Sequence, residues 1–204
     1  MTQSIFIPKI MIIAERGYCS SGAIWKEKIA EIVDILPMFP NVGIQLRAKE
    51  YPLDLEELLM EWPIPKLSEA QIWLNGLHHP HALKRHLPEQ DIETGHPLAT
   101  SASIHSLSAL QRSQHLHFLQ YGAIFPTLKP VEPLGIENLR RICQQSAIPI
   151  LAVGGIQSIA QIAECLQAGA YGISMGSAIL HASNIPQTLQ RYCDFILNHQ
   201  GSKL

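Results

Sequence analysis

The sequence predicts a single (β/α)8 barrel, a TIM barrel, over residues 1–204. Short apolar runs typical of strands alternate along the whole chain with amphipathic stretches typical of helices. No low-complexity tract or linker divides the chain, so we expect one domain of repeated small units. The length of 204 residues lies at the low end for this fold. Parallel strands need crossover helices, so the alternation indicates a parallel sheet.

The strand count favours a barrel. A weak strand is expected around Arg85–Leu87, and seven clearer ones complete a set of eight: Lys9–Ala14, Val42–Arg47, Ala70–Leu74, Leu98–Ile104, His117–Phe125, Ile148–Val153 and Tyr171–Met175. A doubly wound open sheet is the alternative. A dinucleotide fold would place G-x-G-x-x-G after the first strand, where this chain has Glu15-Arg16-Gly17-Tyr18.

Helices are expected between these strands, where apolar residues recur with helical spacing. The predicted helices are Ile24–Leu36, Leu53–Glu61, Ser106–Gln114, Ile136–Gln145, Ile159–Ala168 and Pro186–Leu197.

Composition points to small metabolites as partners. Hydrophobic residues make up 47% of the chain and the formal net charge is −2, with acidic and basic residues interspersed. This pattern supplies no basic stripe for nucleic acid and no polybasic segment for a membrane. The apolar run Ile10–Ala14 is too short for a signal peptide or a membrane span, so we expect a cytoplasmic protein.

Cysteines and histidines give no metal signature. The four cysteines are scattered without a CxxC pair, so we expect buried thiols: Cys19, Cys143, Cys165 and Cys193. The histidines at 78, 79 and 81 adjoin a proline, and a loop explains them better than a metal site.

The last two expected strands end in glycine turns that suit a phosphate group. Gly154-Gly155 follows one strand and Gly176-Ser177 the next, and a helix is expected to begin near Ser158. Glycines let the backbone approach an anion, and helix starts offer N–H donors. The loops after strands 7 and 8 of such barrels frequently bind phosphate. The alternative is that the glycines only form a tight turn.

The second expected strand ends in polar residues. Gln45, Arg47 and Lys49 alternate with apolar residues and so share one face. Polar groups inside a barrel are costly unless they lie at its open end and meet a ligand. Arginine and lysine there suit a polyphosphate, although a solvated strand end remains an alternative.

Seven motifs in register resemble the thiamine-phosphate synthase/TenI family over roughly residues 10 to 182. They are Gln45 to Lys49, Asn75, His86-Leu87, Ser103-Ile104-His105-Ser106, Phe125-Pro126-Thr127-Leu128-Lys129, Leu134-Gly135-Ile136 and Ala152-Val153-Gly154-Gly155-Ile156. The resemblance implies a transferase of thiamine biosynthesis that joins hydroxymethylpyrimidine diphosphate to thiazole phosphate and releases pyrophosphate.

The resemblance also implies roles for residues of this chain. Gln45 would contact the pyrimidine, and Asn75 would hold the diphosphate. Catalytic roles at the departing pyrophosphate would belong to Arg47, Lys49, Ser103 and Lys129. The thiazole phosphate would bind Thr127 and the turns at Gly154, Gly155, Ser174, Gly176 and Ser177.

The implied Mg²⁺ site is where the chain departs from the family. An aspartate is normal after the asparagine, but the chain reads Asn75-Gly76, and the connections at 62–68 and 75–86 are short. Asp91 would be the remaining metal carboxylate, and Mg²⁺ needs only one or two. A position near a helix start is the alternative explanation for Asp91.

Three other functions are weighed. A TenI-type thiazole tautomerase would use a histidine where this chain has Ala123, and neither His86 nor His105 is favoured as a substitute. A Schiff-base aldolase would need a lysine within the sixth strand, which has none. A non-catalytic barrel that binds thiazole phosphate is the third. Trp25 and Phe39, expected on outer helices, leave a homodimer open.

Overall fold

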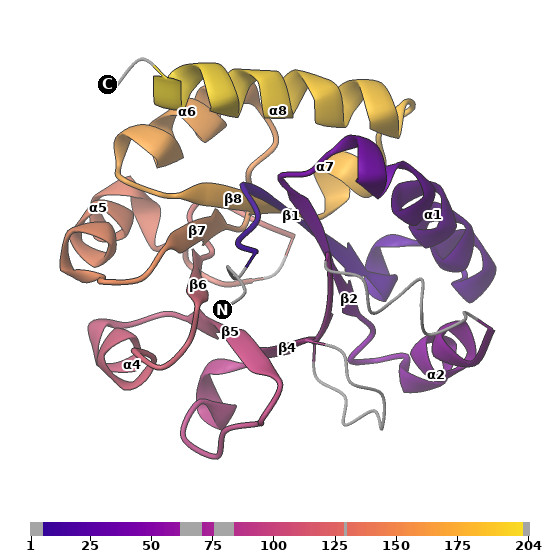
Figure 1. Cartoon of the computed structure of the whole chain (residues 1–204), viewed down its shortest axis with the longest axis horizontal. Coiled ribbons are helices and arrows are strands. Elements are labelled where there is room, and N and C mark those ends of the chain that lie inside the picture. The colour runs from indigo at the N-terminus through magenta and orange to yellow at the C-terminus, as the bar shows by residue number, and fades with distance from the viewer. Residues whose placement is uncertain (1–5, 62–70, 76–83, 129, 202–204) are drawn as a thin grey trace, which may run out of the picture.

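Eight parallel strands close into one barrel (Figure 1). The computed structural model describes residues 6–61, 71–75, 84–128 and 130–201. Each strand pairs with the next in sequence, and β8 pairs with β1. The strands are β1 (Ile10–Glu15), β2 (Val42–Arg47), β3 (Ile72–Asn75), β4 (Lys84–Leu87), β5 (Ala99–Ile104), β6 (Phe118–Gly122), β7 (Ile150–Val153) and β8 (Gly172–Met175). The predicted fold class is confirmed.

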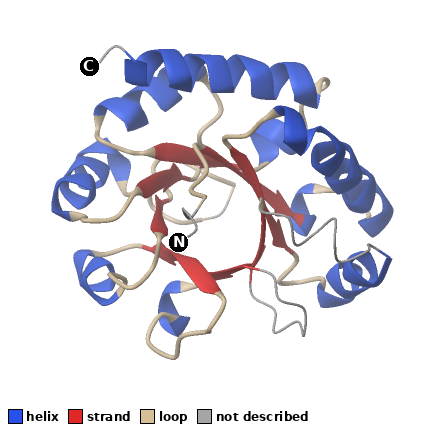
Figure 2. Ribbon diagram, in the orientation of Figure 1, coloured by secondary structure: helices blue, strands red, loops and turns tan. Residues whose placement is uncertain are grey.

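Helices surround the barrel on the outside (Figure 2). They are α1 (Gly22–Ile35), α2 (Pro52–Glu61), α4 (Leu107–Arg112), α5 (Gly135–Gln145), α6 (Ile159–Gln167), α7 (Ser177–Leu180) and α8 (Ile185–Gly201). Short 3-10 turns are η1 (Arg16–Tyr18), η2 (Leu36–Met38) and η3 (Glu89–Asp91). Within the described ranges, no helix is both long and apolar enough to cross a membrane.

The predicted elements differ from the observed ones mainly at their ends. The sixth strand was expected to reach Phe125 but ends at Gly122, because its register partner Val153 is the last residue of β7. The four-residue α7 was not predicted, since one helical turn has no measurable periodicity.

Serine caps fix where three of the helices begin. The side chains of Ser21, Ser106 and Ser158 each accept a hydrogen bond from the backbone N–H three residues on. Such a cap satisfies one of the N–H groups that the first helical turn leaves without a partner, typically contributing about 1 kcal/mol.

The main core lies between the strands and the helices. Trp25 and Phe39 are buried in it rather than exposed on the surface, and two of the four cysteines are less buried than predicted. Trp25 is fully buried and donates from Nε1 to the carbonyl oxygen of Ala14 at 3.1 Å, and Phe39 is 4% exposed. Neither residue therefore offers a dimer surface. Cys165 and Cys193 are buried as expected, but Cys19 and Cys143 are only partly buried.

A second, smaller core fills the barrel interior near the amino ends of the strands. Met11, Trp73, Phe118 and Leu151 form it, and Phe6 with neighbouring residues packs against it. The Trp73 and Phe118 rings meet edge to face, with centroids 5.7 Å apart. The described residues just before β1 lie near the centre of the barrel in Figure 1. The apolar floor leaves the carboxyl ends of the strands as the place for polar chemistry.

Candidate functional site at the carboxyl end of the barrel

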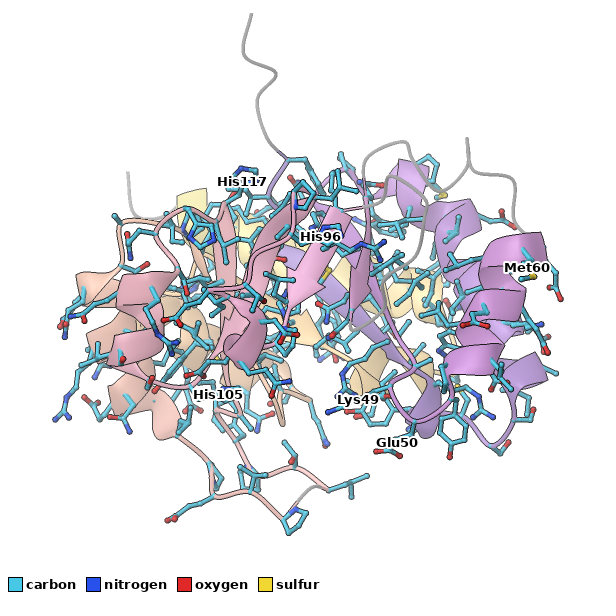
Figure 3. The ribbon with its side chains drawn as sticks, turned by 90° about the horizontal axis from the view of Figure 1, so that it is seen from below. Lys49, Glu50, Met60, His96, His105 and His117 are labelled. Atoms are coloured by element: carbon cyan, nitrogen blue, oxygen red, sulfur yellow. The ribbon has the colours of Figure 1, made fainter. Side chains whose placement is uncertain are left out.

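A row of four polar residues crosses the first strands at their carboxyl ends. Glu15 pairs in register with Arg47, Arg47 with Asn75, and Asn75 with His86. Register partners on parallel strands point the same way, and this row lies on the interior side shared by Met11 and Trp73. Figure 3 shows Lys49 and His105 near this end of the barrel and His117 at the other.

Arg47 and Glu15 form an ion pair inside this end of the barrel. Their side chains are 24% and 11% exposed. Burial lowers the pKa of Arg47 from its ordinary value, and the arginine still stays charged at neutral pH. A partly buried cation therefore lies at the mouth with a carboxylate already against it.

Gln45 lies one layer deeper and is 1% exposed. The Nε2 group of Gln120, on β6, donates to its Oε1 at 2.7 Å. Because this bond engages the carbonyl oxygen, the NH₂ group of Gln45 is the end that can face a ligand.

His86 is held between two serines of the neighbouring strand β5. Its Nδ1 lies 2.9 Å from Ser101 Oγ, and its Nε2 lies 2.9 Å from Ser103 Oγ. Complete burial, and then the charge of Arg47, lower the pKa of His86 from 6.5 to about 3. The ring is therefore neutral at physiological pH, with one N–H and one acceptor nitrogen.

Backbone rather than side chains defines the opposite part of the mouth, after β7. Gly154 and Gly155 have φ angles of 95° and 72°, in the left-handed region that favours glycine. A Cβ atom on Gly155 would come within 2.5 Å of the carbonyl oxygen of Pro126. The N–H of Phe125 donates to the carbonyl oxygen of Gly154 at 3.1 Å, so the turn and the segment after β6 hold each other.

The β8 side brings Ser174, Gly176 and Ser177 to the same end. Ser174 is 1% exposed, and its Oγ has no hydrogen-bond partner in the described part of the chain. Its register partners Met11 and Val153 place it inside the barrel. Ser177 begins α7, and the Tyr18 ring lies directly against Gly176.

The start of α6 offers fewer donors than the sequence suggested. Ser158 Oγ accepts the N–H of Gln161, and Gln161 Oε1 accepts the N–H of Gln157 at 2.8 Å. The helix therefore caps itself, and these two N–H groups are not free for an anion.

Two predicted site residues, one cationic and one with a hydroxyl group, lie further out. Lys49 and Thr127 are exposed, the first just beyond β2 and the second in the loop from β6 to α5. Lys129 lies outside the described residues, as do Gly76 and the three histidines at 78, 79 and 81.

The described residues do not build a metal site on their own. Among them, no group of three or more His, Cys, Asp or Glu side chains could hold a metal ion. Asp91 ends the 3-10 turn η3 and is partly buried. The nearby Glu89 instead accepts hydrogen bonds from the backbone N–H of His105 at 2.8 Å and from Ser106 Oγ. The described residues alone therefore do not supply the ligands for a metal-dependent step.

Sequence reasoning missed three members of this network, namely Glu15, Ser101 and Gln120. Gln120 is a polar residue in the middle of an otherwise apolar strand, which is a signal for an inward hydrogen bond. Glu15 ends its strand at the level of Arg47, but only the register shows that the two meet.

Comparisons with known proteins agree with the fold. A family model described as thiamine monophosphate synthase matches residues 79–179. Over these residues the chain is similar to the thiamine-phosphate synthase/TenI family. A thiamine-phosphate synthase of Latilactobacillus sakei subsp. sakei (strain 23K) is 34% identical over 109 residues, covering 50% of this chain and 48% of that protein. The chain thus spans about half the length of the first curated relatives that it matches.

Other family members match over a longer range at lower identity. A thiamine-phosphate synthase of Proteus mirabilis (strain HI4320) is 27% identical over 173 residues, covering 75% of this chain and 80% of that protein. A solved thiamine phosphate pyrophosphorylase from Pyrococcus furiosus superposes with a TM-score of 0.65 at 21% identity, covering 94% of this chain and 96% of the other. This superposition supports the barrel assignment.

Proposed function

We propose that this protein belongs to the thiamine-phosphate synthase/TenI family and is a thiamine-phosphate synthase. It would join hydroxymethylpyrimidine diphosphate to thiazole phosphate and release pyrophosphate. The observation that carries the proposal is the row of Arg47, Asn75 and His86 in register at the mouth, facing the glycine turn after β7. One side offers charge and amide groups for a diphosphate, and the other offers backbone for a single phosphate.

The proposed chemistry needs little acid or base catalysis. The bond between the pyrimidine methylene carbon and the diphosphate oxygen breaks, and the electron pair leaves with pyrophosphate. The thiazole ring nitrogen then forms a bond to that carbon. Catalysis therefore depends on cations that stabilise the leaving group and on the alignment of the two rings.

Residues around the mouth divide between the two substrates in this proposal. Arg47, Lys49 and Lys129 would stabilise the pyrophosphate, with Asn75 beside Arg47. Gln45 would donate from its NH₂ group to the pyrimidine, and Ser103 would lie where the pyrimidine meets the leaving group. The thiazole phosphate would bind Thr127, Gly154, Gly155, Ser174, Gly176 and Ser177.

Mg²⁺ is a separate part of the proposal. Asp91 would be its carboxylate ligand, but it does not form a metal site with the other described residues. The Gly76→Asp variant tests this part. A stronger Mg²⁺ dependence of turnover would support a metal beside Asn75, and an unchanged dependence would contradict it.

A turnover assay tests the activity. Purified protein is supplied with Mg²⁺, hydroxymethylpyrimidine diphosphate and thiazole phosphate, and thiamine phosphate is measured. Product formation that collapses in Arg47→Ala supports the synthase. Absence of product, with thiazole phosphate still raising the melting temperature, would instead support a non-catalytic binding barrel.

The tautomerase alternative is less well supported. Ala123, directly after β6, stands where the resemblance places the catalytic histidine of TenI-type enzymes. His86 is neutral, but both of its ring nitrogens already contact serine hydroxyls.

A further inference from the structure

We propose that His86 is a positioning residue, which aims the hydroxyl of Ser103 at the reacting centre through the chain Ser101–His86–Ser103. This inference rests on the proposed function, because it concerns the same mouth. It adds a residue to which neither the sequence analysis nor the family match gave a role.

The geometry fixes the imidazole from both sides. Each ring nitrogen lies 2.9 Å from a serine Oγ, and both serines come from β5. Ser101 is 0% exposed and His86 is 1% exposed, whereas Ser103 is partly exposed. The hydrogen-bonded series Ser101–His86–Ser103 therefore runs from the buried interior to the mouth and ends at a hydroxyl that a ligand can reach.

The charge state of the His86 ring limits which groups can donate hydrogen bonds in the series Ser101–His86–Ser103. Because the ring is neutral, only one nitrogen carries a proton. If Nε2 donates to Ser103 Oγ, the hydroxyl hydrogen of Ser103 is left to point at the mouth. If Ser103 instead donates to Nε2, the mouth receives only oxygen lone pairs.

The surroundings favour the first arrangement. Arg47 lies in the same polar row and marks the mouth as a place for an anion. An anionic leaving group accepts hydrogen bonds, so a donor is needed there. We therefore assign the proton to Nε2, with Ser101 donating to Nδ1, as outer hydrogen bonds commonly set the tautomer of a histidine.

Two substitutions distinguish a positioning role of His86 from a role in packing alone. The amide of a glutamine can reach the place of Nε2, whereas the shorter asparagine reaches only the place of Nδ1. His86→Gln should therefore keep the contact with Ser103, and His86→Asn should lose it. Loss of an outer hydrogen-bond partner in metal sites typically costs 10–100-fold in activity, and we expect a similar range for this contact.

The expected result is a fall in kcat on the order of 10–100-fold for His86→Asn and a several-fold smaller fall for His86→Gln. The KM for thiazole phosphate should stay within about twofold, since that substrate binds the other part of the mouth. His115→Gln, at an exposed position before β6, is the matched histidine control. Equal falls in kcat for both His86 variants would overturn the proposal.

A double-mutant cycle tests the route through Ser103. If His86 acts only through that hydroxyl, adding His86→Asn to Ser103→Ala should cost little more than Ser103→Ala alone. Fully additive losses would overturn the proposal.

A measurement on the unmodified protein does not depend on turnover. The ¹⁵N chemical shifts of the His86 ring report which nitrogen is protonated, with and without inorganic pyrophosphate. Protonation at Nε2 supports the inference, and protonation at Nδ1 overturns it even if the protein makes thiamine phosphate. Protonation at Nε2 in a protein without turnover would contradict the proposed function and leave the orientation of Ser103 supported.

Discussion

The two parts of the barrel mouth present different groups to their proposed ligands. The β1 to β5 part presents side chains that already contact one another, such as Arg47 with Glu15 and His86 with two serines. The β7 part presents a backbone turn at Gly154 and Gly155. A ligand at the first part must compete with an existing carboxylate, whereas the turn is shaped by the fold before any ligand arrives.

Arg47→Ala should have the largest effect on activity. Removing a group that stabilises developing charge typically lowers kcat on the order of 10²–10³-fold. The substitution also leaves Glu15 buried without its partner, so the protein should lose stability. Steady-state kinetics and denaturant unfolding measure the two effects.

The double variant Glu15→Ala/Arg47→Ala separates these effects. It should recover part of the lost stability, because no unpaired charge remains, and it should recover none of the activity. Recovered activity in the double variant would show that Arg47 serves only to neutralise Glu15.

Gly155→Ala should damage the backbone part of the mouth. The φ of 72° is unfavourable for alanine, and the new Cβ would meet the carbonyl oxygen of Pro126. We expect a loss of about 1–3 kcal/mol in unfolding free energy, with weaker binding of thiazole phosphate. Urea unfolding and calorimetric titration measure the two effects.

Gly95→Ala is the matched control for this change. Gly95 has a φ of 64°, but nothing lies within 4 Å of the added Cβ atom. It should cost about 1 kcal/mol and leave thiazole phosphate binding unchanged. A smaller loss of unfolding free energy in Gly155→Ala than in Gly95→Ala would contradict the close approach of Gly155 to the carbonyl oxygen of Pro126.

His86 should make stability depend on pH. The folded protein keeps its pKa near 3, whereas the unfolded chain binds a proton near 6.5. The unfolding free energy is therefore highest above pH 6.5 and falls as the pH is lowered from 6.5 toward 3. Unfolding at several pH values should show a steeper fall in the parent protein than in His86→Gln, and parallel curves would contradict the buried neutral ring.

Ser174→Ala should have a small effect on stability, opposite in sign to that of the glycine variants. Its buried hydroxyl has no partner within the described ranges, so its removal should raise the unfolding free energy on the order of 1 kcal/mol. A weaker affinity for thiazole phosphate in this variant would support the proposed contact. A marked loss of stability would mean that the hydroxyl has a structural partner.

The sequence predicted the fold and the place of the glycine turn, because strand spacing and paired glycines are local signals. The positive φ angles of Gly154 and Gly155 agree with a turn there, and phosphate binding at that turn stays a prediction. The pairs Glu15–Arg47 and Gln45–Gln120 could not be predicted, because they depend on strand register and on which residues face inward. The expectation that Trp25 could form part of a dimer surface was wrong for a related reason, since an apolar residue on an outer helix can face the barrel.

The claim that the two parts of the mouth bind different ligands is tested most directly by crossed titrations. Calorimetry measures binding of pyrophosphate and of thiazole phosphate to Arg47→Ala and to Gly155→Ala. We predict that Arg47→Ala loses pyrophosphate and keeps thiazole phosphate, and that Gly155→Ala does the reverse. If both variants lose the same ligand, or neither variant loses either ligand, the assignment of the two parts is wrong.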